Sequence, residues 1–177
     1  KMLPMVVGSY VKPEERIVLV CEPVRAQEII RDLVRIGYDH FVAVVSPDAL
    51  MGAANLVTSP EVTVQEANEQ RGEAFVLDVR GASEHAVGHL ADACNIAYTR
   101  LMPRTGELPR DRRILVHCAL GGRSAAATSM LRRLGFDAVN VAGGFEAWKK
   151  AGLPTAAPAA TAAGSCGSGG CRRCAGG

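Results

Sequence analysis

An internal duplication constrains the fold of this chain more than any other feature. The stretch LVRIGYDHFVAVV (33–45) matches LRRLGFDAVNVAG (131–143) at a constant offset. Upstream, ERIVLVC (15–21) matches RRILVHC (112–118) at an offset smaller by one residue, so each of these segments ends on a cysteine. A repeated segment is one supersecondary unit, and we expect both copies to fold alike.

Each copy reads as a strand, a loop, a helix, a glycine and a second strand. The apolar runs IVLV (17–20) and ILVH (114–117) are typical of buried strands. Residues 124–134 are helix formers, and Gly135 ends that helix. Strands that alternate with helices predict an α/β fold with a central, mainly parallel sheet and helices on both of its faces.

The second copy is preceded by elements that the first copy lacks. Thr63 and Glu66 have the spacing of a capping box and predict the start of a helix that Gly72 closes. FVLDVR (75–80) predicts a buried strand, and FEAWKKAG (145–152) predicts a final short helix. The first copy therefore corresponds to only part of such a unit, and we expect the natural polypeptide to extend upstream.

The chain is thus expected to consist of three segments. Residues 1–57 form a partial, degenerate unit, residues 58–153 form a complete domain, and residues 154–177 form an Ala/Gly/Cys tail that is disordered. The loop of the first copy, CEPVRAQE, has Pro23 and no glycine. Because proline lacks an N–H group and fixes its backbone, we predict that this copy is not catalytic.

Composition and charge exclude several classes of protein. The net charge of +2 gives no reason to expect nucleic acid or an anionic membrane surface as a partner. No apolar run approaches the roughly 18 residues that a membrane-spanning helix needs. The six cysteines are scattered or crowded into the tail, unlike the framework of a small secreted domain, so we expect a cytoplasmic protein.

The candidate site is the segment HCALGGRSA (117–125). Cys118 ends a predicted strand, and the glycines Gly121 and Gly122 let backbone N–H groups approach an anion closely. Arg123 and the start of the next helix add positive charge, which favours the nucleophilic thiolate. The alternative is an inert, buried cysteine beside an ordinary turn, and the two glycines and the arginine argue against it.

Three motifs follow one another in the order found in a known family. They are LDVRGASEHAVGHLADACNIAY, CALGGRS and VAGGFEAWKKAGLP. By these motifs, residues 58–153 resemble the rhodanese family of sulfurtransferases. The resemblance implies a rhodanese-like fold, here preceded by a partial second rhodanese-like unit.

The resemblance also implies the roles of the site residues. Cys118 is then the nucleophile that carries sulfur as a persulfide. The loop that cradles this sulfur consists of Ala119, Leu120, Gly121, Gly122 and Arg123. The residues that support the loop are Asp78, Arg80, Glu84 and Ser124. Among these, Glu84 is expected to form an ion pair with Arg80.

The implied reaction is a double displacement. The Cys118 thiolate attacks the outer sulfur of thiosulfate or a persulfide, and a thiol, sulfite or cyanide then removes that sulfur. Small anionic sulfur donors and these acceptors are therefore the expected partners. No metal and no organic cofactor is required.

Two other functions remain open at this stage. Four residues separate Cys118 from Arg123, whereas the loop of related cysteine phosphatases is one residue longer and holds a tetrahedral oxyanion. The shorter loop favours a single sulfur atom over phosphatase or arsenate reductase activity. The second alternative is a non-catalytic docking or regulatory module within a larger fusion protein.

A partial unit followed by a complete one also resembles the C-terminal part of a group of fusion proteins. These join a metallo-β-lactamase-like domain, an iron-dependent persulfide dioxygenase or a relative of it, to tandem rhodaneses. This chain has no HxHxDH motif, so iron is expected only in an upstream domain.

Several conspicuous residues have simpler interpretations. His85 and His89 are four residues apart, but Gly88 breaks the helix that would align them, so no metal pair is predicted. His117 is expected to be structural, and Trp148 is expected to pack in the core.

The tail cysteines are left with two interpretations. Cys171 and Cys174 have C-x-x-C spacing, with Cys166 upstream. They could act as a redox pair or as a swinging acceptor for the sulfur on Cys118. Alternatively, the tail takes no part in the reaction.

Overall fold

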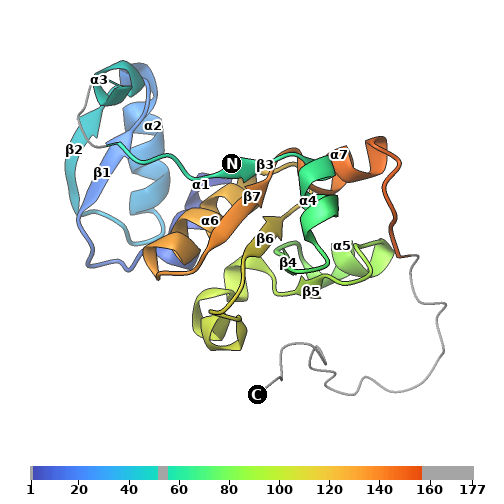
Figure 1. Cartoon of the computed structure of the whole chain (residues 1–177). Coiled ribbons are helices and arrows are strands. Elements are labelled where there is room, and N and C mark those ends of the chain that lie inside the picture. Colours follow the sequence, from blue (N-terminus) through green and yellow to red (C-terminus); the bar gives the residue numbers. More distant parts are fainter. Residues whose placement is uncertain (1, 52–55, 157–177) are drawn as a thin grey trace. The chain divides into compact units, whose positions relative to one another are not determined.

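The computed structural model describes residues 2–51 and 56–156. The chain divides into two compact units, Lys1–Thr58 and Ser59–Gly177, each of which is described by itself (Figure 1). The predicted boundary, between residues 57 and 58, lies one residue before this division. Most of the tail for which disorder was predicted (154–177), including its three cysteines, lies outside the described residues.

The first unit contains a short parallel sheet. Its elements are α1 (Leu3–Tyr10), β1 (Ile17–Val20), α2 (Pro23–Val34), β2 (Phe41–Val45) and α3 (Pro47–Met51). The strands β1 and β2 pair in parallel, and α2 connects them. This is the strand, helix and strand order that the duplication predicts for the first copy.

The helix α2 of this unit follows from local sequence signals. Pro23 occupies the first turn, where its missing N–H group costs nothing and its fixed φ suits a helix. Leu33 is the buried residue of this amphipathic helix. Gly37, with φ of 89°, then turns the chain toward β2.

The second unit contains the remaining elements. They are β3 (Glu61–Val62), α4 (Val64–Gln70), β4 (Phe75–Asp78), α5 (Ala82–Val87), β5 (Cys94–Asn95), the 3₁₀ helices η1 (Tyr98–Arg100) and η2 (Met102–Glu107), β6 (Ile114–His117), α6 (Gly122–Arg133), β7 (Ala138–Val141) and α7 (Gly144–Lys150). Among the described residues, no helix is long and apolar enough to cross a membrane.

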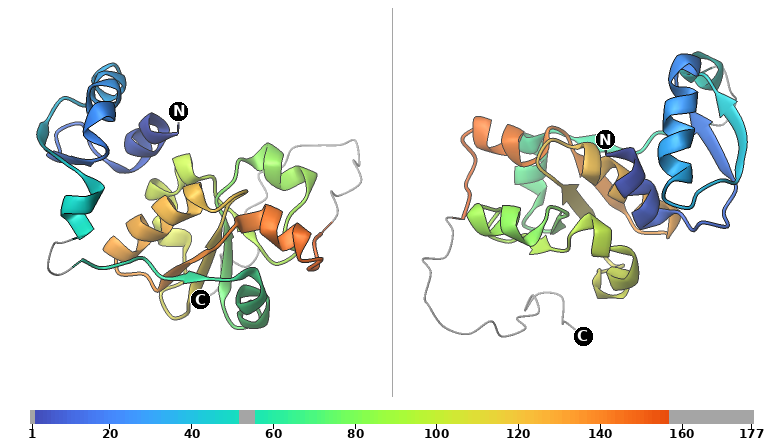
Figure 2. Two further views of the ribbon diagram at one scale, coloured as in Figure 1. Left: turned by 90° about the horizontal axis from the view of Figure 1, so that it is seen from above. Right: turned by 180° about the vertical axis from the view of Figure 1, so that it is seen from behind.

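The strands of the second unit form one parallel sheet in the order β3-β7-β6-β4-β5. Helix α6 packs on β6 and β7 from one face, while α4 and α7 cover the other face (Figure 2). The predicted α/β fold, with a central parallel sheet and helices on both faces, is therefore confirmed.

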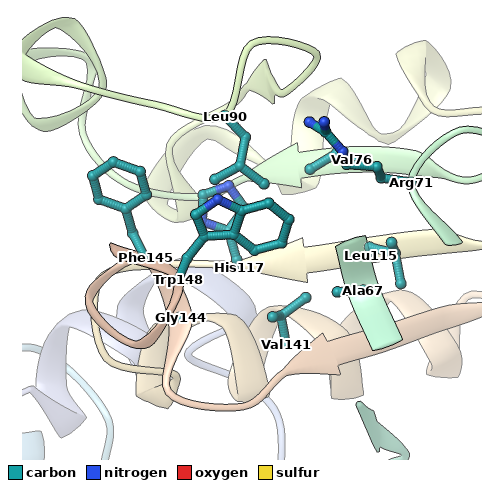
Figure 3. A pocket seen from close by; sticks show the side chains of 10 residues that line it. All are labelled: Ala67, Arg71, Val76, Leu90, Leu115, His117, Val141, Gly144, Phe145 and Trp148. Atoms are coloured by element: carbon teal, nitrogen blue, oxygen red, sulfur yellow. The ribbon is translucent and has the colours of Figure 1, made fainter. Parts of the chain in front are cut away.

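The core between the sheet and the α4–α7 pair is aliphatic and aromatic. Leu115 and Val141 of the sheet pack with Ala67 of α4 and with Phe145 and Trp148 of α7, as predicted for the tryptophan. A cavity of about 10 Å³ lies within this core (Figure 3). That is about the space of one water molecule, so this cavity is a packing defect and not a substrate site.

The helix boundaries shift slightly from the sequence predictions. Thr63 and Glu66 form the predicted capping box, with Glu66 N–H donating to Thr63 Oγ1 over 3.2 Å. Helix α4 ends at Gln70, two residues before the predicted Gly72. The strand predicted over 75–80 ends at Asp78, and the N–H groups of Ile96 and Tyr98, which follow β5, donate to Asp78 O and Val79 O.

Candidate active site

The site lies where parallel strands end at one edge of the sheet. Cys118 follows the last residue of β6, and Asp78 is the last residue of β4 and pairs with His117. Gly121, with φ of 98°, then turns the chain into α6. Carboxyl ends of parallel strands meet at the same edge, which is the usual position of a ligand site in such sheets.

Hydrogen-bond donors of the loop converge on the Cys118 sulfur. The Gly121 N–H group donates to Sγ over 3.1 Å, and the Ser124 hydroxyl lies 3.4 Å from Sγ. Leu120 also contributes its backbone N–H group. The N-terminus of the 12-residue helix α6 adds its partial positive charge. Backbone N–H groups and the end of a helix dipole thus surround the sulfur.

These donors alter the acidity of the thiol. Cys118 is only 1% exposed, and burial, the largest single influence, raises its pKa. Hydrogen bonds from the Ser124 side chain and from the backbone of Ser124, Leu120 and Gly121 lower it, and together they outweigh burial. The net result is a lowered Cys118 pKa, which increases the thiolate fraction at neutral pH.

Helix α7 holds the loop from the other side. Phe145 N–H donates to Cys118 O over 2.8 Å, and Glu146 N–H donates to Ala119 O over 3.0 Å. A Cβ atom at Gly144 would lie 2.5 Å from Cys118 O and 2.8 Å from Ala119 O. Gly144 therefore permits the contact between α7 and the loop. Sequence reasoning gave it no role, although two consecutive glycines after a strand are a signal for close backbone approach.

A buried ion pair lies beside the loop, on the neighbouring strand. Arg80 Nη2 donates to Asp78 Oδ2 over 2.6 Å and to Gly88 O over 2.8 Å. Asp78 and Arg80 are 0% and 4% exposed. Burial, the largest single influence, raises the Asp78 pKa, but hydrogen bonds from Arg80 and His85 lower it by more, so its net pKa is lowered.

Three histidines lie near this pair, and their contacts differ. His85 Nδ1 lies 2.9 Å from Asp78 Oδ2, and its ring stacks on His89 at a centroid distance of 4.0 Å. Burial lowers the pKa of His117, which favours its neutral form. Within the described part of the chain, no group of three or more His, Cys, Asp or Glu side chains could hold a metal ion.

The prediction that Glu84 pairs with Arg80 is wrong. The Glu84 carboxylate instead binds Arg123 through two hydrogen bonds, of 2.7 Å from Nη1 and 2.8 Å from Nη2. Arg80 turns inward because Asp78, two residues away, offers a buried carboxylate. Its one hydrogen bond with Glu84 is to the backbone carbonyl, although its charge also contributes to the lowered Glu84 pKa. Hydrogen bonding to Arg123 lowers the Glu84 pKa, and bonding to Glu84 raises the Arg123 pKa.

A cleft of about 460 Å³ opens beside the loop. Ala119, the residue after Cys118, lies on its wall. Its other lining residues come from the turn and helix that follow β4, from α7 and from the segment that follows α7: Arg80, Glu84, Val87, Gly88, Phe145, Glu146, Lys149, Thr155 and Ala156.

Known proteins resemble the second unit. A family described as Rhodanese-like domain matches residues 62–151. A sulfurtransferase of Allochromatium vinosum is 34% identical over 87 residues, which cover 49% of this chain and 81% of that protein. A probable adenylyltransferase/sulfurtransferase of Mycobacterium tuberculosis is 32% identical over 118 residues. The match covers 65% of this chain but only 30% of that protein.

A third relative and two solved structures agree with this match. An HTH-type transcriptional regulator of Mycobacterium tuberculosis is 31% identical over 69% of this chain and 55% of its own length. A rhodanese-related protein from Thermoplasma volcanium superposes with a TM-score of 0.54 and 35% identity over 55% of this chain and 97% of its own. The rhodanese-like domain of an Anabaena protein superposes with a TM-score of 0.53 and 27% identity, and the match covers 66% of this chain and 94% of that domain. The chain therefore belongs to the rhodanese-like domain family.

Proposed function

We propose that this chain is a sulfurtransferase in which Cys118 takes up a sulfane sulfur as a persulfide and passes it to a thiophilic acceptor. The observation that carries the proposal is the convergence of the Gly121 N–H group and the Ser124 hydroxyl on Sγ. Donors in this arrangement stabilise a negatively charged sulfur, and the Ser124 hydroxyl, which also lies 2.9 Å from Gly121 O, can turn toward the sulfur when it carries charge. Two of the relatives are named as sulfurtransferases, which supports the proposal.

The reaction has two displacement steps. The Cys118 thiolate attacks the outer sulfur of the donor, the sulfur–sulfur bond of the donor breaks, and its electron pair leaves on sulfite or a thiolate. An acceptor nucleophile then attacks the outer sulfur of the Cys118 persulfide. The bond to Cys118 breaks, and the thiolate returns to the cradle, where the Leu120, Gly121 and Ser124 N–H groups stabilise it.

Intact-protein mass spectrometry tests this proposal. The protein and its Cys118→Ser variant are each incubated with thiosulfate and, separately, with an organic persulfide. We expect the parent alone to gain one sulfur atom, and cyanide to remove it. If both proteins gain sulfur, another cysteine is the carrier. If neither does with either donor, the transferase proposal fails.

A second candidate is a non-catalytic docking or regulatory module. The observation that favours it is the burial of Cys118, which is only 1% exposed. If the chain is such a module, it stays folded during incubation with either donor, and iodoacetamide alkylates Cys118 only slowly at neutral pH. Rapid alkylation of Cys118 in the native protein contradicts this alternative.

The relation to fusion proteins is also a proposal. We infer that an upstream metallo-β-lactamase-like domain accompanies this chain, because the order of a degenerate and then an intact unit resembles the C-terminal part of such fusion proteins. Any iron would belong to that domain. The sequence of the complete natural polypeptide tests the inference directly, and an upstream segment without metal-binding histidines contradicts it.

A further inference from the structure

We propose that the sulfur donor of this chain is an organic persulfide and not thiosulfate. The inference rests on the proposed transferase function and goes beyond it by naming the donor class. Two independent features of the site support it, namely the pairing of Glu84 with Arg123 and the cleft beside Ala119.

The first feature concerns the cation nearest to the thiol. Arg123 follows the loop glycines, and its raised pKa reflects hydrogen bonding to Glu84 first and the Cys118 thiolate as a further contribution. Both of its terminal nitrogens are occupied by Glu84, in the two-pronged geometry that makes arginine–carboxylate pairs strong. That carboxylate compensates the guanidinium charge and takes two of its five N–H groups, so only a weakened attraction is left for the oxygens of a sulfonate group.

The charge of Glu84 itself acts in the same direction. Its side chain is 42% exposed at the cleft wall, and its lowered pKa keeps it ionised at neutral pH. Thiosulfate carries two negative charges, so it must approach against this carboxylate or displace it from Arg123. A neutral or singly charged persulfide group meets a smaller repulsion. The pair thus discriminates between donors by charge.

The second feature is the size and chemistry of the cleft. At about 460 Å³ the cleft is much larger than thiosulfate needs and has room for the organic part of an amino-acid thiol, and its lining reaches Ala119, the residue after Cys118. The ring of Phe145 offers an apolar wall, and Lys149 lies on the same wall with its Nζ 5.4 Å from the ring centroid. Lys149 pairs with Glu146 over 2.9 Å, and both side chains are about half exposed. Such a surface pair is weak, so a ligand carboxylate can replace Glu146.

The transfer step balances without an added oxidant or reductant. The Cys118 thiolate attacks the outer sulfur of R–S–SH, and a new sulfur–sulfur bond forms. The bond between the two donor sulfurs breaks, and its electron pair leaves on R–S⁻. The proton stays on the outer sulfur, which becomes the Cys118 persulfide. The organic group R remains in the cleft until the thiolate departs.

The test compares two donors, thiosulfate and cysteine persulfide, by the rate at which one sulfur is added to Cys118. Each rate constant is divided by that for the reaction of the same donor with free cysteine at the same pH, which removes the difference in intrinsic reactivity. We expect this acceleration to be at least about tenfold larger for the persulfide in the parent protein. An equal or larger acceleration for thiosulfate overturns the inference but leaves the proposed function intact.

The variant Glu84→Gln examines the charge argument. The amide preserves size and removes the negative charge, so the thiosulfate-to-persulfide ratio of rate constants should rise about tenfold at low salt and less at high salt. Any change in Cys118 acidity cancels in this ratio. An unchanged or lower ratio contradicts the role of Glu84.

A matched control is available in η2. Glu107 also binds an arginine, Arg104, through two hydrogen bonds of 2.6 Å, and its side chain is 40% exposed, but neither residue lines the cleft. Glu107→Gln should leave the ratio unchanged, and an equal rise in this variant refutes a local effect. If Glu84→Gln does not fold, the donor comparison in the parent protein still decides. Sulfur uptake from neither donor refutes the proposed function itself.

Discussion

Helix α7 contacts the loop that follows Cys118, and adding a single methyl group at this contact tests whether it holds the loop. Gly144 has φ of 57°, and a Cβ atom there would lie 2.5 Å from Cys118 O and 2.8 Å from Ala119 O. Both atoms belong to the backbone, so neither can move aside as the end of a flexible side chain could. In Gly144→Ala, either α7 or the loop must shift.

The expected loss of stability has two parts. A non-glycine residue in the left-handed region costs about 1–2 kcal/mol. Forcing a methyl group into a packed contact costs typically about 1–3 kcal/mol more. Gly152→Ala is a matched control, because Gly152 also has a positive φ, of 67°, but has no atom within 4 Å of the added Cβ. We therefore expect a loss of about 2–5 kcal/mol at Gly144 and about 1–2 kcal/mol at Gly152.

Trp148 makes this comparison specific to the second unit. It is the only tryptophan of the chain and is buried in the core between the sheet and α7. Urea unfolding followed by its fluorescence reports the free energy of unfolding of that unit. Sulfur uptake by Cys118 should also fall about 100-fold in Gly144→Ala, because a shift near 1 Å misplaces the cradle. If the two variants lose the same stability and keep the same uptake rate, the contact does not hold the loop.

Three further predictions follow from the contacts of the same unit. Asp78→Asn should lower the free energy of unfolding by about 3–5 kcal/mol in urea, because it leaves the buried Arg80 charge uncompensated. Since the folded-state pKa of Asp78 is lowered, this stabilisation is present above the unfolded pKa, near 4, and is lost as the pH falls below it. Ser124→Ala should move the pH midpoint of Cys118 alkylation upward, because it removes a hydrogen bond that lowers the thiol pKa; an unchanged midpoint contradicts that role. Thr63→Ala should cost about 1 kcal/mol in the same urea assay by removing the helix cap, and a neutral effect shows that the cap is dispensable.

The strands and the loop that follows Cys118 could be predicted because their signals are local. Apolar runs such as ILVH become buried strands wherever both faces of a sheet are covered, and β6 is indeed buried at all four positions. The capping box of Thr63 and Glu66 likewise needs no tertiary information. A cysteine followed by two glycines at a strand end predicts the turn at Gly121 and the convergence of N–H groups on sulfur.

The ion pairs could not be predicted, because they depend on which side chains the folded backbone brings together. Arg80 had two candidate carboxylates, two and four residues away, and the sequence does not say which one is buried beside it. The structure buries Asp78 with Arg80 and leaves Glu84 on the face of α5 that meets Arg123, 39 residues further along the chain. Charge pairing at such separations is a property of tertiary packing and not of spacing.

The first copy gives a final prediction, because it has the cysteine without the cradle. Cys21 follows β1 as Cys118 follows β6, but α2 begins at Pro23, only two residues later, whereas α6 begins four residues after Cys118. That interval is too short for a loop to curl around sulfur, and Pro23 has no N–H group to donate. We therefore expect peptide mapping after donor treatment to find the added sulfur on Cys118 in the parent, and to find none on Cys21 in either the parent or Cys118→Ser. Sulfur on Cys21 at a comparable rate means that exposure of a thiol, and not the converging donors, governs uptake, and the reasoning from the cradle then fails.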